Sequence, residues 1–277
     1  MKKSRSSVSD IFVQKIWEKS WKLMTREDIA DIWIMSWGSK SRVAYGIGKA
    51  KGQGVVTLIG GGIFYILEQN SGLLSSFAVL RRMDRSSQWL GNLEIDDHYW
   101  QIVALLIRQY SPSGAIIAHE KSMEIHLRDY SIPSRLVLYT RDTQKRIQIG
   151  KYDIHFRTLQ TGEKSGTRNM YRILSDMSEE GMIDDVSLRY LGLESSLLDV
   201  ASLRIHDSGI AEALILRFLE RYSSRLSRDA LGELVKYRYI RALNRVRSLS
   251  KSQGYIDLYE NTLDIIRKEG GGCYLNL

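Results

Sequence analysis

The chain has 277 residues, of which 43% are hydrophobic and 26% are charged, and its formal net charge is +8. The hydrophobic content allows a folded core, and the length favours more than one domain. The single cysteine, Cys273, excludes an intrachain disulfide framework and a cysteine zinc site, and is consistent with a cytoplasmic location. No apolar run is long enough to cross a bilayer, so we expect no membrane partner.

The first quarter of the chain predicts two helices followed by a two-stranded hairpin. A preceding amphipathic helix, residues 9–23, would cover them. Thr25 and Asp28 have the spacing of a capping box at the start of the first of the two helices. The second is expected over residues 39–51, and Gly60–Gly62 turns between two β-branched strands. This order is typical of a winged helix-turn-helix, whose second helix enters the major groove of DNA.

The second helix separates its apolar side chains from its polar ones. Val43, Ala44, Ile47 and Ala50 gather on one side. The residues expected to contact DNA are Ser39, Lys40, Ser41, Arg42, Tyr45, Lys49 and Lys51. Residues 1–70 contain 11 Lys and Arg against 6 Asp and Glu, so this part carries +5 of the total charge. Such an excess is typical of phosphate binding, although a protein-interaction module with a solvated basic face would also fit.

Beyond the hairpin, the patterns predict an α+β protein. We expect a DNA-binding domain over residues 1–72, a linking helix and loop over 73–95, and a C-terminal domain over 96–277. The predicted helices of that domain are 96–108, 115–127, 194–205, 208–222, 229–249 and 254–268. Its predicted strands are 135–140, the two arms of a hairpin within 147–158, and 170–174. Antiparallel strands would therefore pack against a C-terminal helical bundle.

Motifs that would carry catalysis are missing. His119, Glu120 and His126 come closest to a metal-ligand spacing but do not match it, and we expect them to be structural. The carboxylate pairs at 96–97, 179–180 and 184–185 are expected in solvated turns. Gly60–Gly62 lacks the Lys-Ser/Thr of a P-loop. We therefore expect a binding protein rather than an enzyme, with no catalytic residue, metal or cofactor.

Three motifs, taken in order, resemble the AbiEi family of bacterial antitoxins. The first runs from Lys51-Gly52-Gln53-Gly54-Val55-Val56 to Gly62-Ile63-Phe64-Tyr65. The second comprises residues 114–119, then 132–140 and 149–156. The third is Glu194-Ser195-Ser196-Leu197-Leu198-Asp199, similar to a Glu-x-x-Leu-Leu-Asp motif of the family, followed by Ala242-Leu243-Asn244-Arg245. Together they span nearly the whole chain.

The resemblance implies a two-part function. The N-terminal domain would bind double-stranded operator DNA and repress its own operon. The C-terminal domain would neutralise a nucleotidyltransferase-like toxin, with or without a stable complex, in a type IV toxin–antitoxin system for phage defence. The alternative is a stand-alone winged-helix transcriptional regulator whose C-terminal domain binds a ligand or oligomerises. Glu194 and Asp199 would serve as structural carboxylates near a helix N-terminus.

The C-terminal helices are rich in arginine. Arg217 and Arg221 are four residues apart and share a helix face, as do Arg241 and Arg245. The arginine fork suits phosphates and carboxylates. We therefore assign antitoxicity to these four residues, against the alternative that nearby carboxylates such as Glu212 and Glu220 neutralise them.

Overall fold

The computed structural model describes residues 8–19, 23–37, 42–52, 56–66, 95–159, 170–203 and 208–269. Ser39, Lys40 and Ser41, and all but the last residue of the predicted linking region, lie outside them. The chain divides into two compact units. The first comprises Met1–Pro112 with Ile147–Asp153, and the second comprises Ser113–Arg146 with Ile154–Leu277.

The first unit contains the predicted succession of two helices and a hairpin. Its elements up to residue 66 are α1 (Val8–Trp17), β1 (Leu23–Thr25), α2 (Arg26–Trp37), α3 (Val43–Gly52), β2 (Val56–Gly60) and β3 (Ile63–Ile66). The strands form an antiparallel sheet in the order β1-β3-β2. The predicted helix 9–23 is wrong at its end: α1 stops at Trp17, and Leu23 begins a strand that pairs with Tyr65.

Local chemistry accounts for where these elements begin and turn. The Thr25 hydroxyl accepts a hydrogen bond from the Asp28 backbone N–H at 3.1 Å, and the Thr25 N–H donates to the Asp28 carboxylate at 2.8 Å. This reciprocal pair confirms the predicted capping box. Gly61 and Gly62 turn between β2 and β3 with φ of 56° and 79°, a region that glycine enters without a steric cost.

A small apolar core joins α1, α2 and α3. The Phe12 and Trp33 rings meet edge to face, with centroids 4.9 Å apart. Gly46 of α3 lies directly against Trp33, because a Cβ at this position would come within 2.4 Å of the indole ring. The absence of a side chain at Gly46 therefore lets α3 approach α2 closely.

The first unit also contains α6 (Tyr99–Tyr110), close to the predicted helix 96–108, and the segment Ile147–Asp153. Asp96 joins the two, because its carboxylate accepts a hydrogen bond from Lys151 Nζ at 2.9 Å and another from the Tyr152 hydroxyl. The Tyr99 and Tyr152 rings meet at 4.9 Å between centroids.

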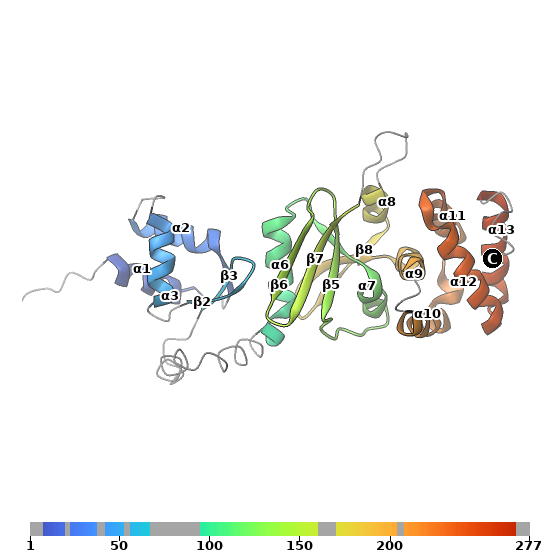
Figure 1. The fold of residues 1–277 in the computed structure, drawn as a ribbon, viewed down its shortest axis with the longest axis horizontal. Helices are drawn as coiled ribbons and strands as arrows, with labels where there is room; N and C mark the ends of the chain where they lie inside the picture. The colour runs from blue at the N-terminus through green and yellow to red at the C-terminus, as the bar shows by residue number, and fades with distance from the viewer. Residues whose placement is uncertain are drawn as a thin grey trace, which may run out of the picture. The chain divides into compact units, whose positions relative to one another are not determined.

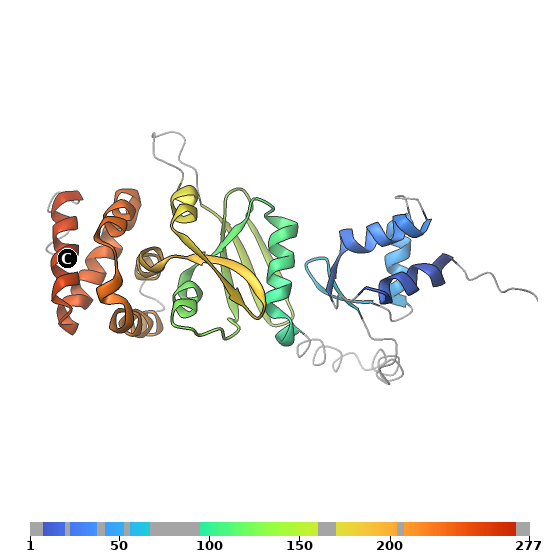
Figure 2. The ribbon, with the colours of Figure 1, turned by 180° about the vertical axis from the view of Figure 1, so that it is seen from behind.

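Strands between residues 115 and 191 form a six-stranded sheet. Its strands are β4 (Ala115–Ile117), β5 (Arg135–Thr140), β6 (Lys145–Ile149), β7 (Tyr152–Thr158), β8 (Ser178–Ile183) and β9 (Val186–Leu191), in the order β6-β7-β5-β4-β9-β8. β4 is antiparallel to β5 but parallel to β9, where Ile117 pairs with Tyr190. Figure 1 shows β5, β6 and β7 side by side. Figure 2, which views the molecule from behind, shows the β8–β9 hairpin in yellow.

The sheet confirms some predicted elements and corrects others. Strand 135–140 and the hairpin within 147–158 are present. The predicted helix 115–127 is instead β4 followed by the short helix α7 (His119–His126). The predicted strand 170–174 is instead the start of helix α8 (Met170–Asp176). Because β4 and β9 are parallel, the sheet is mixed rather than antiparallel throughout.

Helices fill the rest of the second unit, much as predicted. They are α9 (Leu193–Ser202), α10 (Ser208–Tyr222), a 3-10 turn (Ser223–Arg225), α11 (Arg228–Leu234), a π-helical turn (Val235–Tyr239), α12 (Ile240–Gln253) and α13 (Ile256–Glu269). α9 is central, because Leu197, Leu198 and Val200 are fully buried in the core with residues of α10, α11 and α12. Within the described ranges, no helix combines the length and apolar character needed to cross a membrane.

Candidate functional sites

The outer face of α3 carries the predicted DNA-contacting residues that the structure describes. Ile47 and Ala50 are buried and Val43 is half-buried against the core, whereas Ala44 is exposed, contrary to the sequence prediction. Arg42 is exposed just before α3, and Tyr45 is 62% exposed with its ring edge-on to Trp33. This face therefore presents a guanidinium and a phenol on a helix packed firmly on its other side.

Lys49 and Lys51 follow on the same helix. Both are half-buried, and Lys51 Nζ lies 5.4 Å from the centre of the Phe64 ring in β3. A lysine over an aromatic face keeps its charge near the hairpin while its aliphatic part covers apolar surface. The cationic groups thus extend from the helix toward the β2–β3 hairpin.

The four arginines assigned to antitoxicity differ in their surroundings. Arg217, Arg221 and Arg241 are exposed. The Arg221 guanidinium lies over the Tyr222 ring, with Cζ 5.6 Å from the ring centre. Arg245 is half-buried and lies 3.8 Å from the Glu212 carboxylate, which connects α12 with α10. The neutralised-charge alternative therefore holds for Arg245, and Arg241 on the same helix is the more open group.

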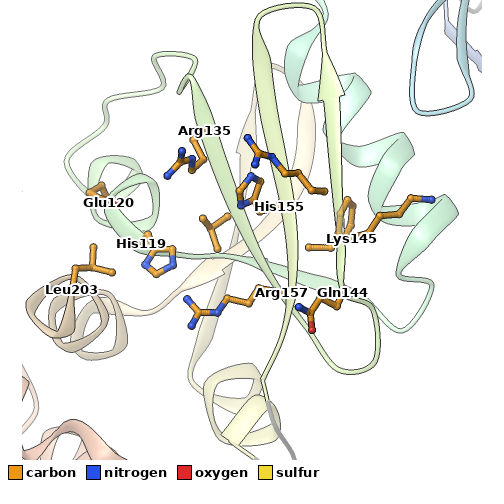
Figure 3. A pocket seen from close by; sticks show the side chains of 11 residues that line it. His119, Glu120, Arg135, Gln144, Lys145, His155, Arg157 and Leu203 are labelled. Atoms are coloured by element: carbon orange, nitrogen blue, oxygen red, sulfur yellow. The ribbon is translucent and has the colours of Figure 1, made fainter. Parts of the chain in front are cut away.

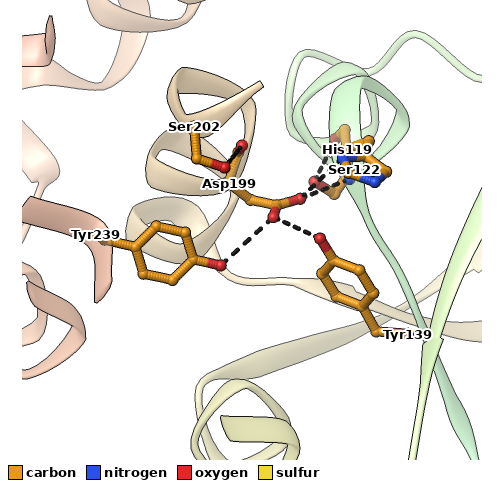
Figure 4. A network of polar contacts seen from close by, with 6 residues as sticks. All are labelled: His119, Ser122, Tyr139, Asp199, Ser202 and Tyr239. Carbon is orange, nitrogen blue, oxygen red and sulfur yellow. Dashed lines mark hydrogen bonds and ion pairs between the residues drawn. The ribbon is translucent and has the colours of Figure 1, made fainter. Parts of the chain in front are cut away.

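A buried carboxylate organises the junction of sheet and helices in the second unit (Figure 4). Asp199 of α9 is only 2% exposed. It accepts hydrogen bonds from the Tyr139 hydroxyl at 2.7 Å, the Tyr239 hydroxyl at 3.4 Å and the His119 backbone N–H at 2.9 Å. Asp199 thereby joins β5, α7 and the π-helical turn to α9, so its role is tertiary rather than that of a first-turn carboxylate.

The electrostatics of this network are strongly perturbed. Burial and the charge of Asp199 raise the pKa of the Tyr139 hydroxyl far above its usual value of 10.0, while Arg157 acts in the opposite direction. Burial and the same carboxylate also raise the pKa of Tyr239. Both hydroxyls therefore remain protonated donors at neutral pH, as Asp199 requires.

Next to Asp199, the second unit contains a cavity of about 680 Å³, which we call the sheet cavity (Figure 3). The side chains that line it and bear on its chemistry are His119, Glu120, Arg135, Val137, Gln144, Lys145, Arg146, His155, Arg157 and Leu203. Arg135 and Val137 alternate along β5, and His155 and Arg157 alternate along β7, so each pair projects from one face of the sheet. Four cationic side chains and a single carboxylate make the lining basic.

His119 connects the sheet cavity with the buried carboxylate. Its Nδ1 lies 3.5 Å from Asp199 Oδ2, and its backbone N–H donates to the same oxygen at 2.9 Å. Its φ of 56° is left-handed, which is uncommon for residues other than glycine and costs free energy. Asp199 therefore stabilises a strained residue at the cavity wall.

His126, the other histidine considered as a ligand, lies at the opposite end of α7. Its Nε2 donates to the Leu191 carbonyl at 2.8 Å, and its ring packs against Tyr190 and Phe218. Across the described part of the chain, no group of three or more His, Cys, Asp or Glu residues could hold a metal ion. Of the carboxylate pairs, Asp184 and Asp185 form the β8–β9 turn as predicted, whereas Glu179 and Glu180 lie in β8.

Sequence reasoning missed the sheet cavity. Arg135, Arg157 and His119 are far apart in the chain, and the strand order β7-β5-β4 brings them together. One signal was available: Asp199 ends the Glu-x-x-Leu-Leu-Asp motif and follows two leucines that are themselves fully buried. A carboxylate in such a run must be buried with donors around it.

No protein-family model matches the chain, and no curated protein matches it. Among solved structures, the chain is similar to the crystal structure of the RV2827C protein from Mycobacterium tuberculosis, with 14% sequence identity and a TM-score of 0.50. The match covers 95% of this chain and 81% of that chain. At this identity, the likeness shows a shared fold and assigns neither a family nor an activity.

Proposed function

We propose that the chain is a DNA-binding antitoxin and transcriptional autorepressor, with residues 8–66 forming a winged helix-turn-helix. The observation that carries the DNA-binding part is the exposure of Tyr45 on the outer face of α3 and of Arg42 just before this helix, with the β2–β3 hairpin next in the order of elements. A helix of this kind fits the major groove, and the hairpin reaches the neighbouring backbone or minor groove. The proposed antitoxin function rests on the motifs that resemble the AbiEi family. Its functional partner would be a nucleotidyltransferase-type toxin.

Operator titrations with single variants test the DNA-binding proposal. We expect Arg42→Ala to cost about 1–3 kcal/mol of specific binding if its guanidinium contacts a base edge. Lys49→Ala should weaken operator and random DNA alike, because a phosphate contact carries no sequence information. The readout is Kd for both DNAs at two salt concentrations. Unchanged affinity of both variants would remove α3 from the interface.

The sheet cavity favours one second candidate, a stand-alone regulator whose second unit binds a small ligand. Co-expression with a candidate nucleotidyltransferase toxin separates the two. An antitoxin restores growth of cells that express the toxin, whereas a stand-alone regulator leaves them inhibited. The first result supports the proposal and the second overturns its antitoxin part, while operator binding is measured independently.

A further inference from the structure

We propose that the sheet cavity binds a nucleotide through its oligophosphate group. This inference concerns the second unit alone and goes beyond the DNA-binding and antitoxin functions proposed above. It rests on the placement of cationic side chains, on the size of the cavity and on the apolar part of its wall.

The cationic groups converge on one space. Figure 3 shows Arg135, His155 and Arg157 turned toward the region beside His119, whereas Lys145 points away from them. Arg135 and Arg157 project from β5 and β7, and both residues are exposed. Because neither side chain is packed in the core, each can reorient toward an anion without disrupting the fold. Guanidinium groups bind phosphate oxygens in a bidentate manner, which favours phosphate over a diffuse negative charge.

The size and the wall of the cavity favour a nucleotide over a simple anion. A volume of about 680 Å³ lies in the middle of the range for small-molecule sites and far exceeds what one phosphate needs. Val137 and Leu203 add apolar surface, and two imidazole rings, His119 and His155, add flat aromatic surface. A base can pack against such groups while the phosphates contact the arginines.

The cavity wall is also held in place before any ligand arrives. The Asp199 carboxylate accepts a hydrogen bond from the His119 backbone N–H at 2.9 Å and so holds this strained residue in place. Asp199 is itself held by the Tyr139 hydroxyl, which donates to it at 2.7 Å. A left-handed histidine next to a basic cavity is the type of strain that the surrounding structure retains at binding sites. Preorganisation of this kind lowers the entropic cost of binding.

Isothermal titration of the full-length chain in EDTA tests the proposal, with ATP, tripolyphosphate and adenosine as the probes. We expect saturable 1:1 binding of ATP, weaker binding of tripolyphosphate and no binding of adenosine. The double variant Arg135→Gln/Arg157→Gln should weaken ATP binding at least ~10-fold, because both arginines contact phosphate oxygens. The matched control is Arg172→Gln/Arg267→Gln, which removes the same two charges from exposed residues outside the cavity and should change Kd less than ~2-fold.

Circular dichroism of each variant establishes that it is folded, and the single variants Arg135→Gln and Arg157→Gln replace the double one if it is not. Operator binding by the double variant should equal that of the wild type, so a failure of the DNA-binding proposal is seen separately. Absence of saturable ATP binding would overturn the inference. So would equal weakening in the control variant, or tripolyphosphate binding as tightly as ATP, which would leave the base without a role.

Discussion

At the scale of single residues, Asp199 connects α9 with three other elements of the second unit. It accepts hydrogen bonds from Tyr139, Tyr239 and the His119 backbone while almost fully buried. We expect Asp199→Ala to lower the free energy of unfolding by about 2–4 kcal/mol, because it leaves buried donors unsatisfied. Urea denaturation followed by circular dichroism measures the change.

Tyr239→Phe is the matched control for Asp199→Ala. It removes only the longest of the three hydrogen bonds, at 3.4 Å, and keeps the ring. Its cost should be about 1 kcal/mol or less. If both variants lose the same stability, the network is not centred on Asp199.

The buried imidazole of His126 leads us to expect that the stability of the folded chain depends on pH. Burial lowers the pKa of its imidazole below the usual 6.5, although the bond to the Leu191 carbonyl acts in the opposite direction. As pH falls below about 6.5, the unfolded chain takes up a proton at His126 that the folded chain does not, so this residue's contribution to stability is lost on acidification. We expect His126→Gln to lower stability at pH 7.5 and to flatten the decline between pH 7.5 and 5.5. Parallel stability curves for the two proteins would contradict this assignment.

At the scale of elements, the packing of α3 on α2 depends on one glycine. A methyl group on Gly46 would come within 2.4 Å of Trp33, so Gly46→Ala should destabilise the first unit by about 1–3 kcal/mol. Gly48 lies on the same helix with no atom near its Cβ position, and Gly48→Ala should instead stabilise by about 0.5–1 kcal/mol. Tryptophan fluorescence during urea unfolding measures both. The same sign for the two substitutions would mean that helix propensity, not contact with Trp33, governs α3.

The elements that could be predicted from the sequence are those whose signals are local. Thr25 and Asp28 cap their helix within one turn, and Gly61 permits its own turn. β4 was misassigned because Ala115, Ile116 and Ile117 are all buried, and a short buried run has no period that separates strand from helix. The β8–β9 hairpin was missed although its two-residue turn, Asp184-Asp185, is of a type that joins antiparallel strands. The sheet cavity could not be predicted, because its lining residues meet only through the strand order, and no local sequence pattern specifies that order.

At the scale of the whole molecule, the proposal separates two activities on one chain. Arg241→Glu with Arg245→Glu should abolish protection from the toxin and leave operator affinity unchanged, because these residues lie in the second unit, away from α3 in the sequence. Growth of toxin-expressing cells and operator Kd are the two readouts. A folded double variant that still protects would return these arginines to the solvated surface.

Glu212→Gln is the control for that double variant. It breaks the ion pair with Arg245, at 3.8 Å, without reversing any charge on α12. Protection should survive it, since a half-exposed pair of this kind contributes little to stability. Loss of protection in Glu212→Gln would mean that the geometry of α10 and α12 matters rather than the positive charge.

The parallel pairing of β4 with β9 also has a consequence for synthesis. β4 can pair with β5 soon after both leave the ribosome, but its other edge has to wait until Tyr190 and its neighbours in β9 emerge. Until then a nascent chain exposes the unpaired backbone of an apolar strand, which is a template for association with other chains. Translation between β5 and β9 is thus an interval in which the nascent chain is exposed to aggregation and in which a chaperone would protect it.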